Sequence, residues 1–129
     1  MDTTTTQRQA DLFRALMHPA RLAILEMLRD GQACVCHLEA HLGYRQAYLS
    51  QQLATLRAAG LIRDRRAGWN IYYEVALPEL FALLDLSRAL VGVTASDTRA
   101  QARPPNCPCP TCAAKVAHSL ASDPHSVEA

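Results

Sequence analysis

The sequence predicts a mainly α-helical domain that carries one small β-hairpin, and three observations support this. Apolar residues recur at helical spacing in five separate segments. Two short β-prone segments, 61–66 and 70–75, interrupt that pattern and enclose a turn. From residue 94 onward the composition shifts to Ala, Ser, Asp and Pro, and no long apolar period remains. We therefore expect one folded domain over residues 1–93 and a flexible, cysteine-containing tail over residues 94–129.

Length and composition narrow the class of protein. A chain of 129 residues that is 50% hydrophobic forms only a small core, which an oligomer would enlarge. The polar N-terminus is unlike a secretory signal, and the apolar runs are too short to span a bilayer, so we expect a cytoplasmic protein without a membrane partner. In that reducing compartment, five cysteines favour metal binding or redox sensing over structural disulfides.

The first two predicted helices meet at a proline. Residues 1–6 are expected to fray, and apolar spacing then predicts a helix over 7–17. His18 precedes Pro19 and so avoids the helical region, whereas the proline suits the first turn of the next helix. That second helix is expected to stop at Asp30-Gly31.

The next two predicted helices are joined by a tight turn at Gly43. The third helix is expected over 36–42 and the fourth over 45–59, ended by Gly60. The apolar stripe of the fourth helix consists of Leu49, Leu53 and Leu56. Two helices of this length joined in this way form a helix-turn-helix pattern.

A β-hairpin and a fifth helix complete the predicted domain. The strands 61–66 and 70–75 flank a turn at 67–69, and basic residues cluster near this turn. Such a hairpin behind a helix-turn-helix is a wing, so the fold class is a winged helix-turn-helix. Pro78 opens the fifth helix, which is expected to end near Gly92.

The solvent face of the fourth predicted helix suits double-stranded DNA. It is polar but almost uncharged, whereas a merely solvated helix usually carries Lys–Glu pairs. Five arginines lie between positions 45 and 66 against one acid, a local charge of +4, although the formal net charge of the chain is only +1. The candidate DNA-binding residues are Arg45, Gln46, Tyr48, Ser50, Gln51 and Gln52 of the helix and Arg65 and Arg66 of the wing.

Two aromatic residues near this surface have open alternatives. Tyr48 suits DNA contact, or packing at a dimer or domain contact. Trp69 at the wing turn is expected either to stack on nucleic acid or to anchor the hairpin to the domain.

Two groups of cysteines are candidate metal ligands. Cys34 and Cys36 are separated by one residue, and in a regular helix such residues point about 200° apart. They can share one ion only if the pair straddles the helix start or distorts it. The second group, in the tail, is Cys107, Cys109 and Cys112.

Thiolates select soft ions, and three sulfurs suit As(III) or Pb(II), whereas four suit Cd(II) or Zn(II). The tail thiols are expected to bind alone, or to complete the Cys34/Cys36 pair, also across a dimer. His37 and His41 have the i, i+4 spacing of a zinc-binding pair, but a solvated helix explains them better because no third ligand lies near in the sequence.

Five segments together resemble the ArsR/SmtB family of dimeric winged-helix repressors, which sense metals and metalloids: residues 16–25, 34–38, 49–53, 56–62 and 68–73. The resemblance implies homodimers that pack through the first and fifth helices and bind an inverted repeat. Cys34-Val-Cys36-His-Leu is similar to the Cys-Val-Cys-Asp-Leu metal box of the family's arsenic, antimony, cadmium and lead sensors. The family's fifth-helix zinc site is not expected here, because that segment has Asp85 but no histidine.

The leading functional hypothesis is a repressor that leaves operator DNA when As(III), Cd(II) or Pb(II) binds its cysteine thiolates. The alternative is a thiol-based redox-sensing repressor with the same fold, since Cys109 and Cys112 have the spacing of a redox motif. An enzyme is not expected, because no strand–helix–strand pattern surrounds the cysteines and no Gly-rich phosphate loop is present.

Overall fold

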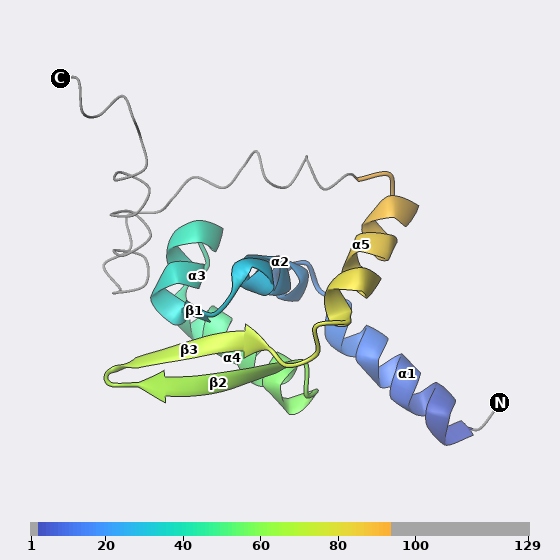
Figure 1. Ribbon diagram of the computed structural model, residues 1–129, viewed down its shortest axis with the longest axis horizontal. Helices are drawn as coiled ribbons and strands as arrows, with labels where there is room; N and C mark the ends of the chain where they lie inside the picture. Colours follow the sequence, from blue (N-terminus) through green and yellow to red (C-terminus); the bar gives the residue numbers. More distant parts are fainter. Residues whose placement is uncertain (1–2, 94–129) are drawn as a thin grey trace.

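The computed structural model describes residues 3–93, so the predicted tail lies outside the described residues. These residues form α1 (Thr3–Leu16), α2 (Pro19–Met27), η1 (Leu28–Asp30), β1 (Ala33–Cys34), α3 (Val35–Leu42), α4 (Gln46–Ala58), β2 (Ile62–Ala67), β3 (Asn70–Val75) and α5 (Leu80–Leu90). The predicted fold class is confirmed, with one small sheet beside a body of helices (Figure 1). Within this part of the chain, no helix has the length and apolar character needed to cross a membrane.

The core lies where α2, α3 and α4 meet, and the leucine stripe of α4 fills it. Its largest fully buried side chains are Ile24, Leu25, Leu38, Leu49, Leu53, Leu56 and Leu61. Between α3 and α4, Gly43 adopts φ 74° and its amide donates to the carbonyl of Glu39, which ends α3 as a left-handed cap. The helix-turn-helix predicted from the sequence is thus confirmed.

The hairpin of β2 and β3 projects away from the side of the molecule where α1 and α5 lie (Figure 1). Ala67 pairs with Asn70, so the turn contains only Gly68 and Trp69 and is one residue shorter than expected. Gly68 has φ 62°, a conformation in which glycine meets no steric cost.

A third strand, β1, was not predicted. It pairs antiparallel with β3, with Ala33 opposite Tyr73 and Cys34 opposite Tyr72, and the sheet order is β1-β3-β2. A two-residue strand carries no readable alternation, because its identity comes from a partner about 40 residues away in sequence. The consequence is that Cys34 belongs to the sheet that carries the wing.

Helix α1 begins at Thr3, so the expectation of a frayed segment over residues 1–6 is wrong from that residue on. Threonine is a poor helix former, but adding residues to an existing helix costs less than starting one. The helix is supported by Gln7 and Arg14, which both donate to Asp11 Oδ1. Of its fourteen residues, only Ala15 and Leu16 are buried, so α1 has little to pack against within the described chain.

Ionic contacts fasten α5 to α2 and the short turn after it. Arg29 donates to both carboxylate oxygens of Glu26 and of Asp85, with a shortest distance of 2.6 Å to Asp85. Arg88 lies 2.8 Å from Glu26, and the Arg29 guanidinium lies 4.9 Å from the ring centre of Phe81. The hydrogen bonds to Glu26, and then to Asp85, raise the pKa of Arg29 above its usual value. The docking of α5 is therefore held by charge as well as by Leu80 and Leu84.

Candidate DNA interface and thiol site

The first two turns of α4 present a polar surface to solvent. Arg45 caps the helix from an extended conformation without a side-chain capping bond, so the first amides of the helix point outward with a basic residue beside them. Gln46 in the first turn, Ser50 on the flank of the helix and Gln51 on the side away from the buried leucines are all exposed. This surface has the donors and acceptors that base edges and phosphates require.

Gln52, which we expected among the DNA-binding residues, does not belong to that surface. It is 8% exposed, and its Oε1 accepts a hydrogen bond of 2.9 Å from Arg21 Nε. The same arginine donates through Nη1 to the carbonyls of Arg14 and Ala15 at the end of α1. The expected role in DNA contact is therefore corrected: Gln52 ties α4 to α2 and α1 and sets the position of the exposed residues.

Tyr48 is half-buried, and it packs against neighbouring side chains while part of it remains exposed at the candidate interface. Its ring lies 5.2 Å from that of Tyr44, and its hydroxyl lies 3.3 Å from His18 Nε2. His18 Nδ1 accepts from the amide of Ala20 as the cap of α2, so the proton of a neutral ring lies on Nε2. That nitrogen then donates to the Tyr48 oxygen, and the tyrosine proton remains available to another acceptor.

Acidic partners neutralise two of the five arginines that lie between positions 45 and 66. Arg57 pairs with Asp64 at 3.3 Å, and Arg63 pairs with Glu74 at 2.8 Å. Within residues 3–93, the other three arginines form no ion pair: Arg45, Arg65 and Arg66. These three are exposed, and they are the arginines that the sequence singled out. They are available to phosphates.

The two thiols of the first cysteine pair meet at the junction of β1 and α3. Cys34 ends the strand, caps the helix from an extended conformation and is 3% exposed. Cys36 lies in the first turn of α3, half-buried, and packs against a small cluster formed by Cys34 and Tyr72. The pair straddles the helix start, which is the arrangement that two thiols so spaced need in order to share an ion.

A row of paired residues crosses the sheet from this thiol site to the wing. Tyr72 of β3 lies opposite Cys34 on one side and opposite Arg65 of β2 on the other. Directly paired residues point to the same face of a sheet and contact each other. Arg65 also donates to Gln32 Oε1 at 3.0 Å, just before β1. Arg65 of the wing is therefore linked to the thiol site in two ways: through Tyr72, which lies opposite Cys34, and through its hydrogen bond to Gln32.

The described residues supply only part of a metal site. Residues 3–93 contain no group of three or more His, Cys, Asp or Glu side chains placed to hold an ion. The rings of His37 and His41 lie 4.2 Å apart on α3, as their spacing predicts, but they belong to no such group. The remaining predicted ligands, Cys107, Cys109 and Cys112, lie outside the described residues.

Four residues that shape these sites are given no role by the sequence analysis above: His18, Arg21, Gln32 and Tyr72. His18 carried a signal, because a polar residue directly before a proline at the first helical position suits a helix cap. Arg21 carried none, since it meets Gln52 from 31 positions away.

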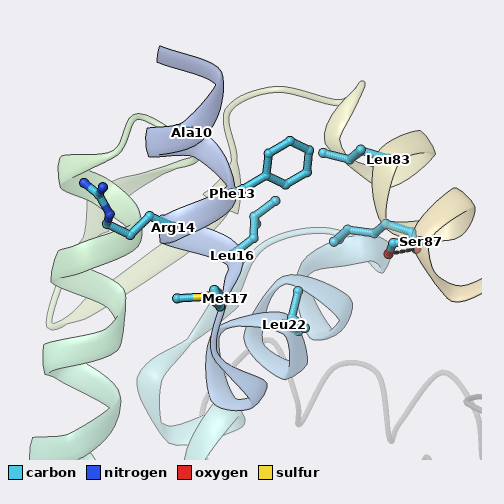
Figure 2. A pocket seen from close by; sticks show the side chains of 9 residues that line it. Ala10, Phe13, Arg14, Leu16, Met17, Leu22, Leu83 and Ser87 are labelled. Atoms are coloured by element: carbon cyan, nitrogen blue, oxygen red, sulfur yellow. Dashed lines mark hydrogen bonds between the residues drawn. The ribbon is translucent and has the colours of Figure 1, made fainter. Parts of the chain in front are cut away.

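A second surface, apolar in character, lies between α1, α2 and α5. A cavity of about 650 Å³ opens there, lined by apolar side chains that include Phe13, Leu22 and Leu83 (Figure 2). Phe13 of α1 and Met17 directly after it line this cavity and are exposed, and α5 adds the exposed Leu86 and Leu90. Exposed apolar surface around such a cavity is typical of a site that binds a ligand or another protein.

The family described as "Bacterial regulatory protein, arsR family" matches residues 18–64, the span from the α2 cap to the first half of the wing. The chain is 38% identical over 90 residues to the HTH-type transcriptional regulator Rv0081 of Mycobacterium tuberculosis, which covers 69% of this chain and 79% of the relative. Against the crystal structure of Rv0081 the TM-score is 0.64 at 34% identity, over 71% of this chain and 92% of that one.

Two further solved structures are similar. The antimony-specific transcriptional repressor AntR gives a TM-score of 0.64 at 30% identity, over 70% of this chain and 83% of that one. The homodimeric winged helix-turn-helix domain Mb0332 from Mycobacterium bovis gives a TM-score of 0.63 at 27% identity, over 69% of this chain and 82% of that one.

Proposed function

Since this chain belongs to the arsR family of bacterial regulatory proteins, we propose that it is a repressor released from its operator when a thiophilic ion binds its cysteine thiolates. Members of this family are DNA-binding transcriptional regulators rather than enzymes, and some of them respond to metal ions. The observation that carries the proposal is the place of the thiol pair. Cys34 and Cys36 lie where the strand beside the wing joins the helix that packs on α4.

In this proposal, α4 contacts the bases of the operator and the wing contacts the phosphate backbone of the DNA. The exposed residues Gln46, Ser50 and Gln51 contact base edges and phosphates, and Tyr48 donates its hydroxyl proton to a phosphate. Three arginines complete the proposed interface: Arg45 at the start of α4, and Arg65 and Arg66 on the wing strand β2. Their open charges supply the salt-dependent part of the affinity.

We place the second copy of the chain on the apolar surface of α1 and α5. Two observations support a homodimer there: the largely exposed α1 and the cavity of about 650 Å³ between α1, α2 and α5. The homodimeric state of Mb0332, a domain of the same fold, is consistent with this. A symmetric dimer presents its two reading helices to half-sites about one helical turn apart, about 34–36 Å.

The ion site combines the thiol pair with the tail. Two sulfurs are too few for As(III), Pb(II) or Cd(II), because these soft ions take three or four. Cys107, Cys109 and Cys112 would supply the remaining ligands, so that As(III) or Pb(II) uses three sulfurs and Cd(II) uses four. The antimony specificity of AntR supports an inducer of this chemical class.

Ligand binding at the pair disturbs both DNA-contacting elements at once. Because Cys34 is almost fully buried, its sulfur reaches an ion only if β1 moves away from β3. The pairing of β1 with β3 is short, two residue pairs in the described chain, which favours a local opening over unfolding of the hairpin. It changes the surroundings of Tyr72 and Arg65 in the sheet and the start of α3, which packs on α4. By linkage, operator DNA weakens ion binding by the same factor.

Operator release tests this function. The probe is a labelled duplex selected from random DNA on the wild-type protein, and fluorescence anisotropy reports binding with and without As(III), Cd(II) or Pb(II). We expect one of these ions to weaken wild-type binding and to leave Cys34→Ser/Cys36→Ser on the DNA. A Cys107→Ser/Cys109→Ser/Cys112→Ser variant should need more ion for the same release. Equal release of the wild type and the Cys34→Ser/Cys36→Ser variant would contradict the proposal.

The redox-sensing alternative retains support from the contact between Cys36 and the cluster that contains Cys34. Two thiols so close could be oxidised to a disulfide by peroxide, which is reduced to water. Release by peroxide in the presence of a metal chelator, reversed by a dithiol reductant, would favour this alternative over ion binding.

A further inference from the structure

We propose that Trp69 is a DNA-contacting residue at the wing tip, where its indole enters the minor groove and favours A·T pairs beside each half-site. This inference rests on the proposed function as a DNA-binding repressor. Trp69 is the single tryptophan of the chain and the second residue of the two-residue hairpin turn. It is 102% exposed, so it does not anchor the hairpin to the described domain.

Nothing in the hairpin itself requires a tryptophan at this position. The positive φ that the turn needs falls on Gly68, whereas Trp69 has an ordinary backbone conformation and lies outside the strand pairing. Small polar residues such as Asn, Asp and Ser are the usual choice there. The exposed indole buries no apolar surface within the described residues, so its whole area is available to a partner.

The charge around the ring identifies the chemistry of that partner. Arg65 and Arg66 lie on the strand that leads into the turn, exposed and without an ion pair in the described chain. An exposed aromatic ring at the tip of a hairpin whose incoming strand carries two exposed arginines suits a polyanion with stacked apolar surfaces, which is DNA, better than an apolar protein groove. The hairpin also projects away from α1 and α5, so the proposed dimer leaves its tip uncovered (Figure 1).

The groove follows from the single polar group of the indole. Its N–H is a donor only. In the minor groove, every A·T or T·A pair offers acceptors at adenine N3 and thymine O2, whereas a G·C pair adds a guanine amino donor. A donor-only side chain therefore prefers A·T pairs. Arginines favour the same sequences, because A·T tracts narrow the minor groove and strengthen its negative potential.

The intrinsic fluorescence of Trp69 tests the contact directly, because no other tryptophan contributes. The full-length protein is titrated with the selected duplex, and anisotropy of the labelled duplex reports binding in the same samples. We expect the emission to shift to shorter wavelength or to be quenched by the bases, and acrylamide to quench the remainder less. Binding by anisotropy with unchanged emission and unchanged acrylamide quenching would overturn this inference and leave the repressor function intact. Absence of binding would overturn both.

Matched variants test the specificity. Trp69→Ala should weaken operator binding about tenfold, the effect of returning a few tens of Å² of apolar surface to water, and should leave the melting temperature unchanged. Trp69→Phe keeps a ring but has no N–H, so it should retain most of the affinity while losing discrimination against G·C pairs in the flanks. Wild-type affinity in Trp69→Ala, or equal flank preference in Trp69→Phe and the wild type, would overturn the inference.

Discussion

Neighbouring glutamines on α4 have opposite roles at the scale of single residues. Gln51 is exposed on the candidate reading surface, whereas Gln52 is buried and accepts from Arg21. The side chains are identical, and 100° of rotation along the helix decides which one meets solvent and which one meets the end of α1.

Replacing each glutamine by alanine separates these roles. Gln52→Ala leaves Arg21 Nε without its buried acceptor, so we expect the free energy of unfolding to fall by about 1–3 kcal/mol. Gln51→Ala should change stability by less than about 0.5 kcal/mol but weaken operator binding by about 1–3 kcal/mol. Urea denaturation and operator titration measure the two quantities.

Each variant is the control of the other, because they lie on the same turn of the same helix. A stable Gln52→Ala that binds the operator tenfold more weakly would show that Gln52 contacts DNA after all. Binding unaffected by Gln51→Ala would remove that residue from the reading surface.

Buried apolar residues can be predicted from this sequence more reliably than the partners of polar side chains. The leucine stripe of α4 is buried as its spacing predicts, since each leucine is placed by a local period. Gln52 was misplaced because its environment depends on Arg21, and contacts between distant polar residues leave no periodic trace.

At the scale of elements, the turn at Gly43 connects the thiol site to α4. Gly43 has φ 74°, and an added Cβ would meet no atom within 4 Å, so a substitution there carries backbone strain alone. Strain at this position acts on the hinge between α3 and α4 without disturbing the packing of either helix.

We expect Gly43→Ala to lower the free energy of unfolding by about 1–2 kcal/mol, the cost of the left-handed conformation for a residue with a Cβ. Gly43→Asn is the matched control, because asparagine tolerates this conformation and should cost less. Both should weaken ion-dependent release less than the thiol substitutions do. Equal stability of the alanine and asparagine variants would show that the turn relaxes its conformation.

A helix or strand can be predicted from the sequence when residues within that same segment determine it. Five helices and the hairpin follow from periodicity and from glycine or proline boundaries, and the structure confirms them within the described residues. β1 and the first turn of α1 were missed. The strand depends on Tyr72 and Tyr73 from a distant segment, and the helix start depends on propagation through four threonines of low propensity.

The wing should set part of the salt dependence of operator binding. Arg66 is exposed and unpaired in the described chain. In a dimer it occurs twice, so Arg66→Ala should reduce the slope of log K against log salt by about two. Arg63→Ala is the control, because Arg63 is already paired with Glu74, and it should change the slope less. Equal slopes for both variants and the wild type would exclude Arg66 from phosphate contact.

At the scale of the whole molecule, the apolar surface of α1 and α5 is where we place the dimer contact. Leu90 lies on α5 and is 82% exposed, which is a large apolar side chain with no cover in the described chain. Leu90→Lys would place two charges in the proposed dimer contact.

We expect Leu90→Lys to be monomeric in sedimentation and to lose operator affinity by about a hundredfold or more, because two linked half-site contacts become one. Ala58→Lys, at an exposed position at the end of α4, is the control and should sediment as the wild type does. A wild-type protein that sediments as a monomer would contradict the proposed assembly.

The high solvent exposure of α1 has a consequence for folding. An isolated helix of fourteen residues is marginal in water, and only two residues of α1 are buried within residues 3–93. If the partner completes its burial, association and folding share one free energy, and the melting temperature rises with protein concentration. A cell that makes little of this repressor would then hold it partly unfolded and open to proteolysis, so the abundance of the protein would govern its own lifetime.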